Sequence, residues 1–176
     1  MKTISVPWFM PMIAVTAMSF LVYFISQQVL RQSANDPQIQ IAEDIVAALS
    51  SGKQAADFNI SDKINIAKSL APYSIIYDVN GKPLASTGEL NGEIPKLPQG
   101  VFESAKSMGE NRISWQPQQD VRSALVIVPY PGGFVAAGRS LREVEMRESN
   151  MLKLTGVFWG IAMVVMAILF LFRKKK

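Results

Sequence analysis

Hydrophobicity along the chain separates two long apolar stretches from a mixed segment between them. No charged residue occurs from Pro7 to Leu30 or from Leu154 to Phe172. An α-helix rises about 1.5 Å per residue and the hydrocarbon core of a bilayer is about 30 Å thick, so about 20 apolar residues cross it. The pattern therefore predicts transmembrane helices over residues 7–30 and 154–172, with a domain over residues 31–153 between them.

The first apolar stretch has one alternative interpretation, a cleaved signal peptide. Such a peptide carries about 7–15 apolar residues followed by a cleavage site of small residues. The stretch here is longer, and Arg31-Gln32-Ser33-Ala34 fits such a site poorly. We therefore expect an uncleaved anchor.

The segment between the spans begins with the periodicity of helices. From Ile39 to Leu49 apolar residues recur every three or four positions, after Asn35-Asp36-Pro37, which is typical of a helix start. Gly52 ends this run. A second short helix is predicted from Ser61-Asp62 to Pro72, with Ile64, Ala67, Leu70 and Ala71 on one side.

From Tyr73 the period changes to two, which indicates strands. Asn80-Gly81 between two such runs predicts a hairpin. A loop from Gly88 to Gly100 follows, and then a third helix that Gly109 ends. Three more strands and a final amphipathic helix are predicted around the sequences NRISWQ, VRSALVIVPY, GFVAAGRS and LREVEMRESNMLKL.

This order of elements predicts an α+β fold, a five-stranded antiparallel sheet with packing helices, flanked by two transmembrane helices. Lys and Arg near the spans predict its orientation, because short segments rich in these residues stay in the cytoplasm. Lys2 precedes the first span, and Arg173 to Lys176 follow the second. We therefore expect a two-pass protein of the bacterial inner (plasma) membrane, with residues 1–6 and the basic tail 173–176 in the cytoplasm and the domain in the periplasm.

The net charge of +4 belongs to these terminal segments. Five of the 18 Lys and Arg lie there, while all 14 acidic residues lie in the domain, which leaves the domain at −1. A nucleic-acid-binding domain has a basic face. We therefore expect the lipid bilayer to be the partner of the basic tail, and we expect no nucleic acid partner.

Two segments resemble a known family: YDVNGKPLASTG, residues 77–88, and GENRISWQPQQDVRSALVIVPYPGGFVAAGRSLREVE, residues 109–145. They are similar to the hairpin and the last three strands of the extracytoplasmic PAS-like sensor domain, of the single Cache type, of bacterial membrane histidine kinases. The resemblance implies a small-molecule site between the sheet and its covering helix and loops. Those kinases continue into a phosphoacceptor histidine helix and an ATPase domain. This chain has no His and ends four residues after the second span, so we expect it to signal through a membrane protein partner.

Aromatic and arginine side chains on the predicted strands are the candidates for ligand binding. An Arg on a half-buried strand can pair with a carboxylate through two parallel hydrogen bonds. The alternative is that the arginines lie on the surface and the aromatic residues in the core. Asp78 is interpreted as a turn residue that organises Asn80-Gly81. The candidates are Tyr77, Trp115, Arg122, Tyr130 and Arg139.

The amino-acid composition does not indicate a catalytic site. Neither His nor Cys occurs, so no Ser-His-Asp or Cys-His arrangement can form, and a zinc site would need carboxylates alone. The Gly residues lie in turn sequences and not in a phosphate-binding loop. We expect no enzyme activity, no cofactor and no metal.

Gly156 and Gly160 form a Gly-x-x-x-Gly pattern in the second span, which is typical of closely packed membrane helices. Its partner would be the first span, a second copy in a homodimer or another membrane protein. Two hypotheses on function therefore remain. The first is a membrane-anchored sensory or ligand-binding module without its own output domain. The second is a structural or accessory membrane protein whose domain is a protein-interaction surface with no small-molecule ligand.

Overall fold

The structure is a computed structural model that describes residues 9–33 and 35–174. Residues 1–8 and 175–176 lie outside the described residues, and with them the predicted N-terminal segment, the start of the first span and part of the basic tail. Contacts divide the chain into two units. Gln32–Val144 form the domain, and Met1–Arg31 with Glu145–Lys176 form the helical unit.

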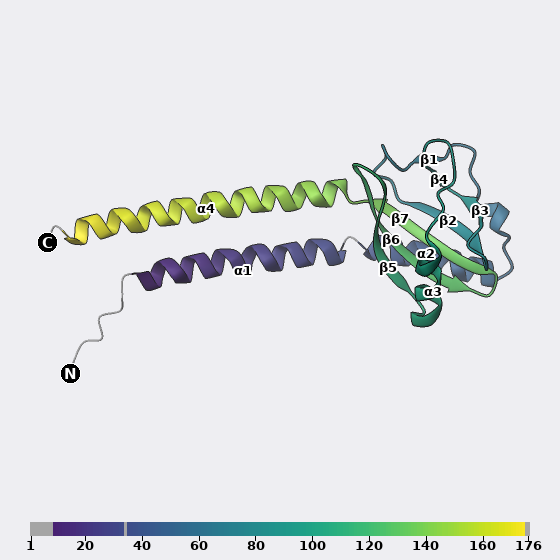
Figure 1. Cartoon of the computed structure of the whole chain (residues 1–176), viewed down its shortest axis with the longest axis horizontal. Coiled ribbons are helices and arrows are strands. Elements are labelled where there is room, and N and C mark those ends of the chain that lie inside the picture. The colour runs from purple at the N-terminus through teal and green to yellow at the C-terminus, as the bar shows by residue number, and fades with distance from the viewer. Residues whose placement is uncertain (1–8, 34, 175–176) are drawn as a thin grey trace. The chain divides into compact units, whose positions relative to one another are not determined.

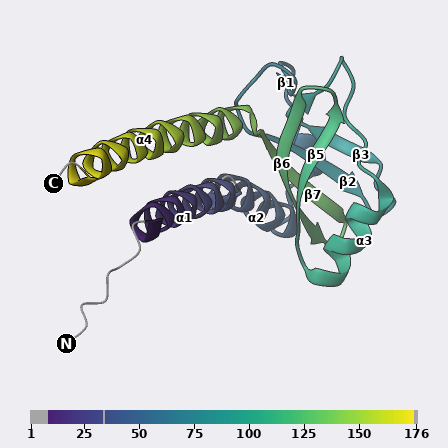
Figure 2. The same ribbon diagram turned by 60° about the vertical axis from the view of Figure 1, so that its left-hand side comes forward.

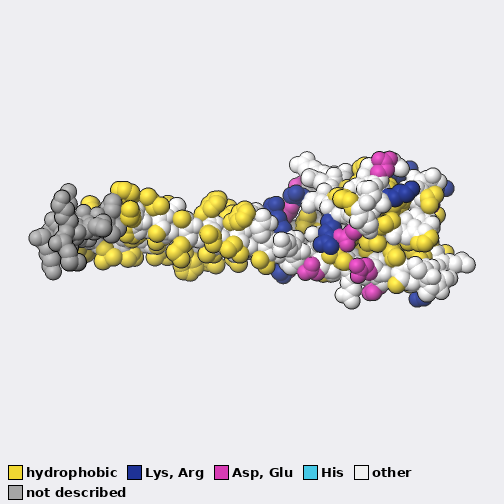
Figure 3. Space-filling view, turned by 90° about the horizontal axis from the view of Figure 1, so that it is seen from below, with side chains coloured by type: hydrophobic (Ala, Val, Ile, Leu, Met, Phe, Trp, Pro, Cys, Tyr) yellow, Lys and Arg dark blue, Asp and Glu magenta, His cyan; other side chains and the backbone are white. Residues whose placement is uncertain are grey.

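The helical unit consists of α1 (Phe9–Ser33) and most of α4 (Arg142–Lys174) (Figure 1). Both helices are long and apolar enough to cross a membrane, and their apolar stretches are not buried in protein. Figure 3 shows apolar side chains over the visible face of these helices, whereas Lys, Arg, Asp and Glu gather on the domain and next to it. The helical spans predicted from the charge-free stretches are therefore present as helices.

Polar side chains lie where α1 and α4 face each other. The indole Nε1 of Trp159 donates a hydrogen bond to Thr16 Oγ1 over 3.0 Å. Near the domain end of the pair, Arg31 Nε lies 2.7 Å from Glu148 Oε1. Partly buried residues of α1 recur at helical spacing along this side: Val15, Ser19, Tyr23, Ser26 and Leu30.

The domain is built on a five-stranded antiparallel sheet with the order β3-β2-β7-β6-β5. This confirms the predicted α+β sheet of five antiparallel strands. The strand β7 lies in the middle and pairs with β2 on one side and β6 on the other. The strands are β2 (Tyr73–Asp78), β3 (Pro83–Ser86), β5 (Asn111–Gln118), β6 (Val121–Tyr130) and β7 (Gly133–Ser140).

A helix covers each face of the sheet (Figure 2). On one face, α2 (Asp36–Ser50) buries Ala42 and Ile45 against Ile76, Val135 and Ala137. On the other face, α3 (Gln99–Met108) and neighbouring loops cover a larger core. That core includes Tyr73, Ile75, Tyr77, Trp115, Leu125, Ile127 and Phe134. Alternate residues of each strand point to opposite faces, so both helices find an apolar surface.

The hairpin predicted at Asn80-Gly81 is present, and Asp78 organises it. Asp78 Oδ1 accepts hydrogen bonds from the backbone N–H of Asn80 at 2.9 Å and of Lys82 at 2.8 Å. Gly81 has φ +77°, which glycine adopts without steric cost. The predicted role of Asp78 as a turn residue is confirmed.

The predicted helix between Ser61-Asp62 and Pro72 is wrong. The chain there instead forms a strand β1 (Ile64–Asn65), which pairs in parallel with β4 (Gly88–Glu89). A short 3-10 helix η1 (Ala55–Phe58) precedes it. The backbone N–H of Ile64 donates to Thr87 O and that of Ile66 to Glu89 O. These bonds, with Ile66 buried in the core, outweigh the local helical pattern.

The N-terminal end of α2 also differs from the expected cap. Pro37 stands in the first turn as predicted, but Asn35 makes no side-chain capping hydrogen bond. Its backbone carbonyl accepts from Gln38 and Ile39 N–H instead.

Candidate ligand-binding pocket

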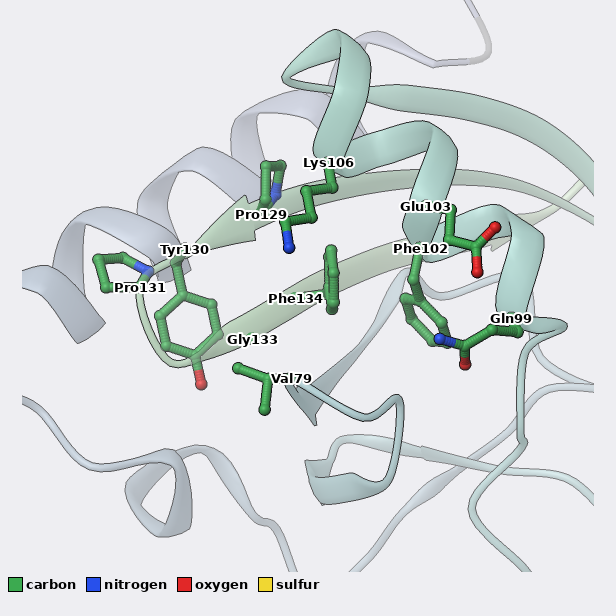
Figure 4. A pocket seen from close by; sticks show the side chains of 10 residues that line it. All are labelled: Val79, Gln99, Phe102, Glu103, Lys106, Pro129, Tyr130, Pro131, Gly133 and Phe134. Carbon is green, nitrogen blue, oxygen red and sulfur yellow. The ribbon is translucent and has the colours of Figure 1, made fainter.

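A pocket of about 360 Å³ lies where α3 meets the turn between β6 and β7 (Figure 4). Pockets for small organic ligands in proteins have volumes of about 300–1,000 Å³. Most of the side chains that line it are apolar, and Lys106 is the cationic one. The lining includes Val79, Phe102, Lys106, Pro129, Tyr130 and Phe134.

Aromatic rings form one wall of the pocket. Phe102 of α3 is 2 % exposed, and its ring centroid lies 4.9 Å from that of Phe134 on β7. On its other side it meets the ring of Tyr77 edge to face at 5.0 Å. Such contacts fix each ring, since offset and edge-to-face arrangements are the favoured ones. The wall is therefore a firm part of the core.

The turn between β6 and β7 positions Tyr130 at the pocket. A Cβ added to Gly132 would lie 2.6 Å from Tyr130 Cε2, so the absence of a side chain there lets the ring fold back over the turn. Burial raises the pKa of the Tyr130 hydroxyl, and the negative charge of Asp78 raises it further. The hydroxyl therefore remains a hydrogen-bond donor at neutral pH.

The polar side chains of α3 lie differently around this wall. Figure 4 shows the amine of Lys106 between Pro129 and Phe134, inside the pocket. The carboxylate of Glu103 and the amide of Gln99 lie beyond Phe102. Lys106 and Glu103 thus place one positive and one negative charge in the lining of the pocket.

The pocket is joined to α4 by a single strand. Gly133 and Phe134, which line it, are the first two residues of β7. β7 ends at Ser140, and α4 begins at Arg142. Any ligand that moves the start of β7 therefore acts on the strand that leads directly into α4.

The five residues predicted as ligand contacts do not come together. Tyr130 lines the pocket. Tyr77 is fully buried, and its hydroxyl donates to Pro95 O over 2.9 Å. Trp115 belongs to the core on the same face of the sheet. Arg122 and Arg139 lie on the other face, since Arg139 pairs with Ala124 in register and Ala124 is two residues from Arg122.

Arg139 holds the end of β7 to the loop before β2. Its Nε donates to Leu70 O over 3.2 Å, and its Nη2 lies 3.7 Å from Glu143 Oε2 on α4. Arg142 Nη2 donates to Lys68 O over 3.0 Å. These contacts give Arg139 a place at the junction of β7 and α4 and not in the pocket.

Among the pocket residues outside the predicted set are Phe102, Lys106 and Phe134. The apolar spacing of α3 indicates that Phe102 is buried, and the alternation of β7 indicates the same for Phe134. Nothing in the local sequence indicates that Lys106 would line the same pocket as Pro129, because this depends on how α3 crosses the sheet.

A second hollow, of about 370 Å³, lies between α1 and α4 and is lined by Ser19, Ser26 and Thr155 among apolar side chains. Gly156 and Gly160 do not contribute to this contact: a Cβ added at either would meet no atom within 4 Å. Among the described residues, no three acidic side chains gather as metal ligands would.

Comparisons with protein-family models, with curated protein sequences and with solved structures found no match.

Proposed function

We propose that the protein is a membrane-anchored sensory module that binds a small molecule in the pocket next to Lys106. The observation that carries this proposal is the position of the pocket at the start of β7, whose other end runs into α4. The resemblance of residues 77–88 and 109–145 to extracytoplasmic PAS-like domains supports it. In this proposal α1 and α4 cross the inner membrane of a bacterium, and the domain lies outside.

The middle position of β7 makes it suited to carry a displacement. It is hydrogen-bonded to β2 along one side and β6 along the other, so it moves as part of the sheet and does not bend freely. At its end, Arg139 contacts Leu70 O and Glu143. A ligand that shifts Phe134 would change these contacts at the first turn of α4, and a membrane protein partner would receive the change.

The experiment uses the full chain in lipid nanodiscs. The chain has no Cys, so a single Cys at Met146 on α4 carries one fluorophore without other substitutions. A small-molecule library is screened for compounds that raise the melting temperature and change the fluorescence in a saturable way. The proposal requires both responses to the same compound.

A blocked pocket provides the control. Val79 lines the pocket and is 63 % exposed, so Val79→Trp fills the opening without disturbing the core. Leu84→Trp places the same ring on another exposed position outside the lining. Val79→Trp should abolish both responses, and Leu84→Trp should retain them. Equal responses in the two variants would contradict the proposal.

The second candidate function is that of an accessory membrane protein that binds no small molecule. It is favoured by the open face at Gly156 and Gly160, where another helix could approach closely. Crosslinking in native membranes with and without Gly156→Ile separates the two. If the variant loses its membrane partner and no compound binds the pocket, this function replaces the first.

A further inference from the structure

The pocket next to Lys106 has a chemistry that narrows its ligand. We infer that it takes a small organic monoanion, with a flat or branched apolar body and one carboxylate at one end. This inference rests on the proposed function, because it names the ligand class of the same site.

The apolar body follows from the walls. Phe102, Phe134, Pro129 and Val79 surround the space with hydrocarbon surface. Burying apolar surface is favourable in proportion to the area removed from water, so an apolar ligand body gains most of its affinity here. A sugar or another polyhydroxylated ligand would leave its hydroxyl groups without partners against these walls.

The anion follows from Lys106. The last turn of α3 carries Lys106, and Figure 4 shows its amine between Pro129 and Phe134. Lys106 is exposed, so its ammonium group attracts an anion that enters the pocket from solvent. A cationic ligand would meet a like charge at the same place.

A single carboxylate follows from the number of donors. Lys106 is the only cationic side chain among the lining residues, all of which are described. Glu103 also lines the pocket, beyond Phe102, and would repel a second carboxylate that extended toward it. A dicarboxylate would therefore bring one charge more than the pocket compensates.

Three probes of one shape and different charge test this inference on the full chain in nanodiscs. They are 3-phenylpropionate, 3-phenylpropan-1-ol and 3-phenylpropylamine, and their dissociation constants are measured by calorimetry or by ligand-observed NMR. A hydrogen bond to a charged group contributes about 1.5–3 kcal/mol. The acid should therefore bind about 10- to 100-fold more tightly than the alcohol, and the amine more weakly than either.

Lys106→Met tests the residue and keeps the length of the apolar stem. It should reduce the preference for the acid over the alcohol to less than about threefold, while the alcohol binds as before. Lys106→Glu should reverse the order so that the amine binds best. Lys96→Met removes the same charge from an exposed residue outside the lining and should change none of the three constants.

The outcomes of these measurements distinguish a failure of the anion inference from a failure of the proposed sensory function. If the alcohol or amine binds the wild type as tightly as the acid, or if Lys106→Met retains the preference, the anion inference is overturned. The proposed sensory function is then tested separately, by the responses of Val79→Trp and Leu84→Trp in the library screen. If no probe binds the wild type at concentrations up to several millimolar, the inference is overturned as well.

Discussion

At the scale of single residues, Gly138 determines how the central strand packs against Tyr73. A Cβ at this position would lie 2.5 Å from Tyr73 Cζ and 2.6 Å from Leu125 Cδ1. Both neighbours are buried, so they cannot move aside freely. We expect Gly138→Ala to lower the free energy of unfolding by about 1–3 kcal/mol, the usual effect of overpacking. Pulse proteolysis of the full chain in urea measures it.

The matched control is Gly100→Ala. Gly100 lies in α3, and an added Cβ meets no atom within 4 Å. Alanine is the better helix former, so this variant should be as stable as the wild type or gain up to about 1 kcal/mol. If the two variants lost the same free energy of unfolding, the close contact with Tyr73 would not be the reason why a side chain at residue 138 is destabilising.

Two buried tyrosines of the same core differ in hydrogen bonding. Tyr77 donates to Pro95 O, whereas neither Tyr73 Oη nor Ser123 Oγ has a hydrogen-bond partner within the described part of the chain. Tyr77→Phe should therefore cost about 1 kcal/mol and leave the Pro95 carbonyl unsatisfied. Tyr73→Phe should cost nothing or stabilise the domain. Urea unfolding measures the free energy of unfolding of both variants. A larger loss of stability in Tyr73→Phe than in Tyr77→Phe would contradict this prediction.

The same burial makes the domain sensitive to alkaline pH. Burial raises the pKa of Tyr73 to about 12. An unfolded chain loses this proton near pH 10, so between these values the unfolded state binds fewer protons than the folded state. Stability then falls as pH rises.

Comparison with Tyr73→Phe isolates this contribution. Between about pH 9 and about pH 11, the wild type should lose about 1 kcal/mol more than Tyr73→Phe. Tyr77, whose pKa burial also raises, is present in both proteins and cancels from the difference. Parallel urea titrations at the two pH values provide the measurement, and equal losses would show that Tyr73 is accessible to hydroxide.

At the scale of elements, the hydrogen bond from Trp159 to Thr16 links α1 to α4. Hydrogen bonds between membrane helices contribute about 0.6 kcal/mol on average and up to about 1.7 kcal/mol. A double-mutant cycle of Thr16→Val and Trp159→Phe should give a coupling energy in this range. Unfolding by SDS in bicelles measures the four proteins. Strictly additive effects would show that the two side chains do not interact.

The elements themselves were largely predictable, and the exception is informative. The strands from Tyr73 to Ser140 follow a period of two, and α3 ends at Gly109 in the left-handed conformation, as its sequence indicates. The stretch from Ile64 to Ala71 has helical spacing, but the backbone N–H groups of Ile64 and Ile66 donate to the carbonyl oxygens of residues 87 and 89. A partner that lies more than twenty positions away cannot be inferred from local periodicity.

The site was predictable only in part for the same reason. Tyr130 lines the pocket because it precedes the turn at Pro131 and Gly132. Arg122 and Arg139 carry charges on strands, which favoured them as ligand contacts, but their face of the sheet is the one that α2 covers. Lys106 reaches the pocket from α3, and its position depends on the crossing of that helix over the sheet.

At the scale of the whole molecule, the distribution of charge is the strongest constraint on location. The described apolar stretches of α1 and α4 carry no charged residue, while the domain carries charges of both signs. Water would leave these stretches exposed along their whole length, and a bilayer would cover them. Both helices are long and apolar enough to cross a membrane, so membrane insertion stays the prediction that the next experiment tests.

Insertion in the orientation that the basic termini favour can be tested with single cysteines, because the chain has none. Ser107→Cys lies at the exposed end of α3, and Lys176→Cys lies in the basic tail. An impermeant maleimide added to spheroplasts should label Ser107→Cys at once and Lys176→Cys only after the membrane is opened. Labelling in the reverse order would place the pocket in the cytoplasm, where it would meet a different set of ligands. Immediate labelling of both would mean that the second apolar helix does not cross the membrane, and the route from β7 through α4 would then end on the outer surface.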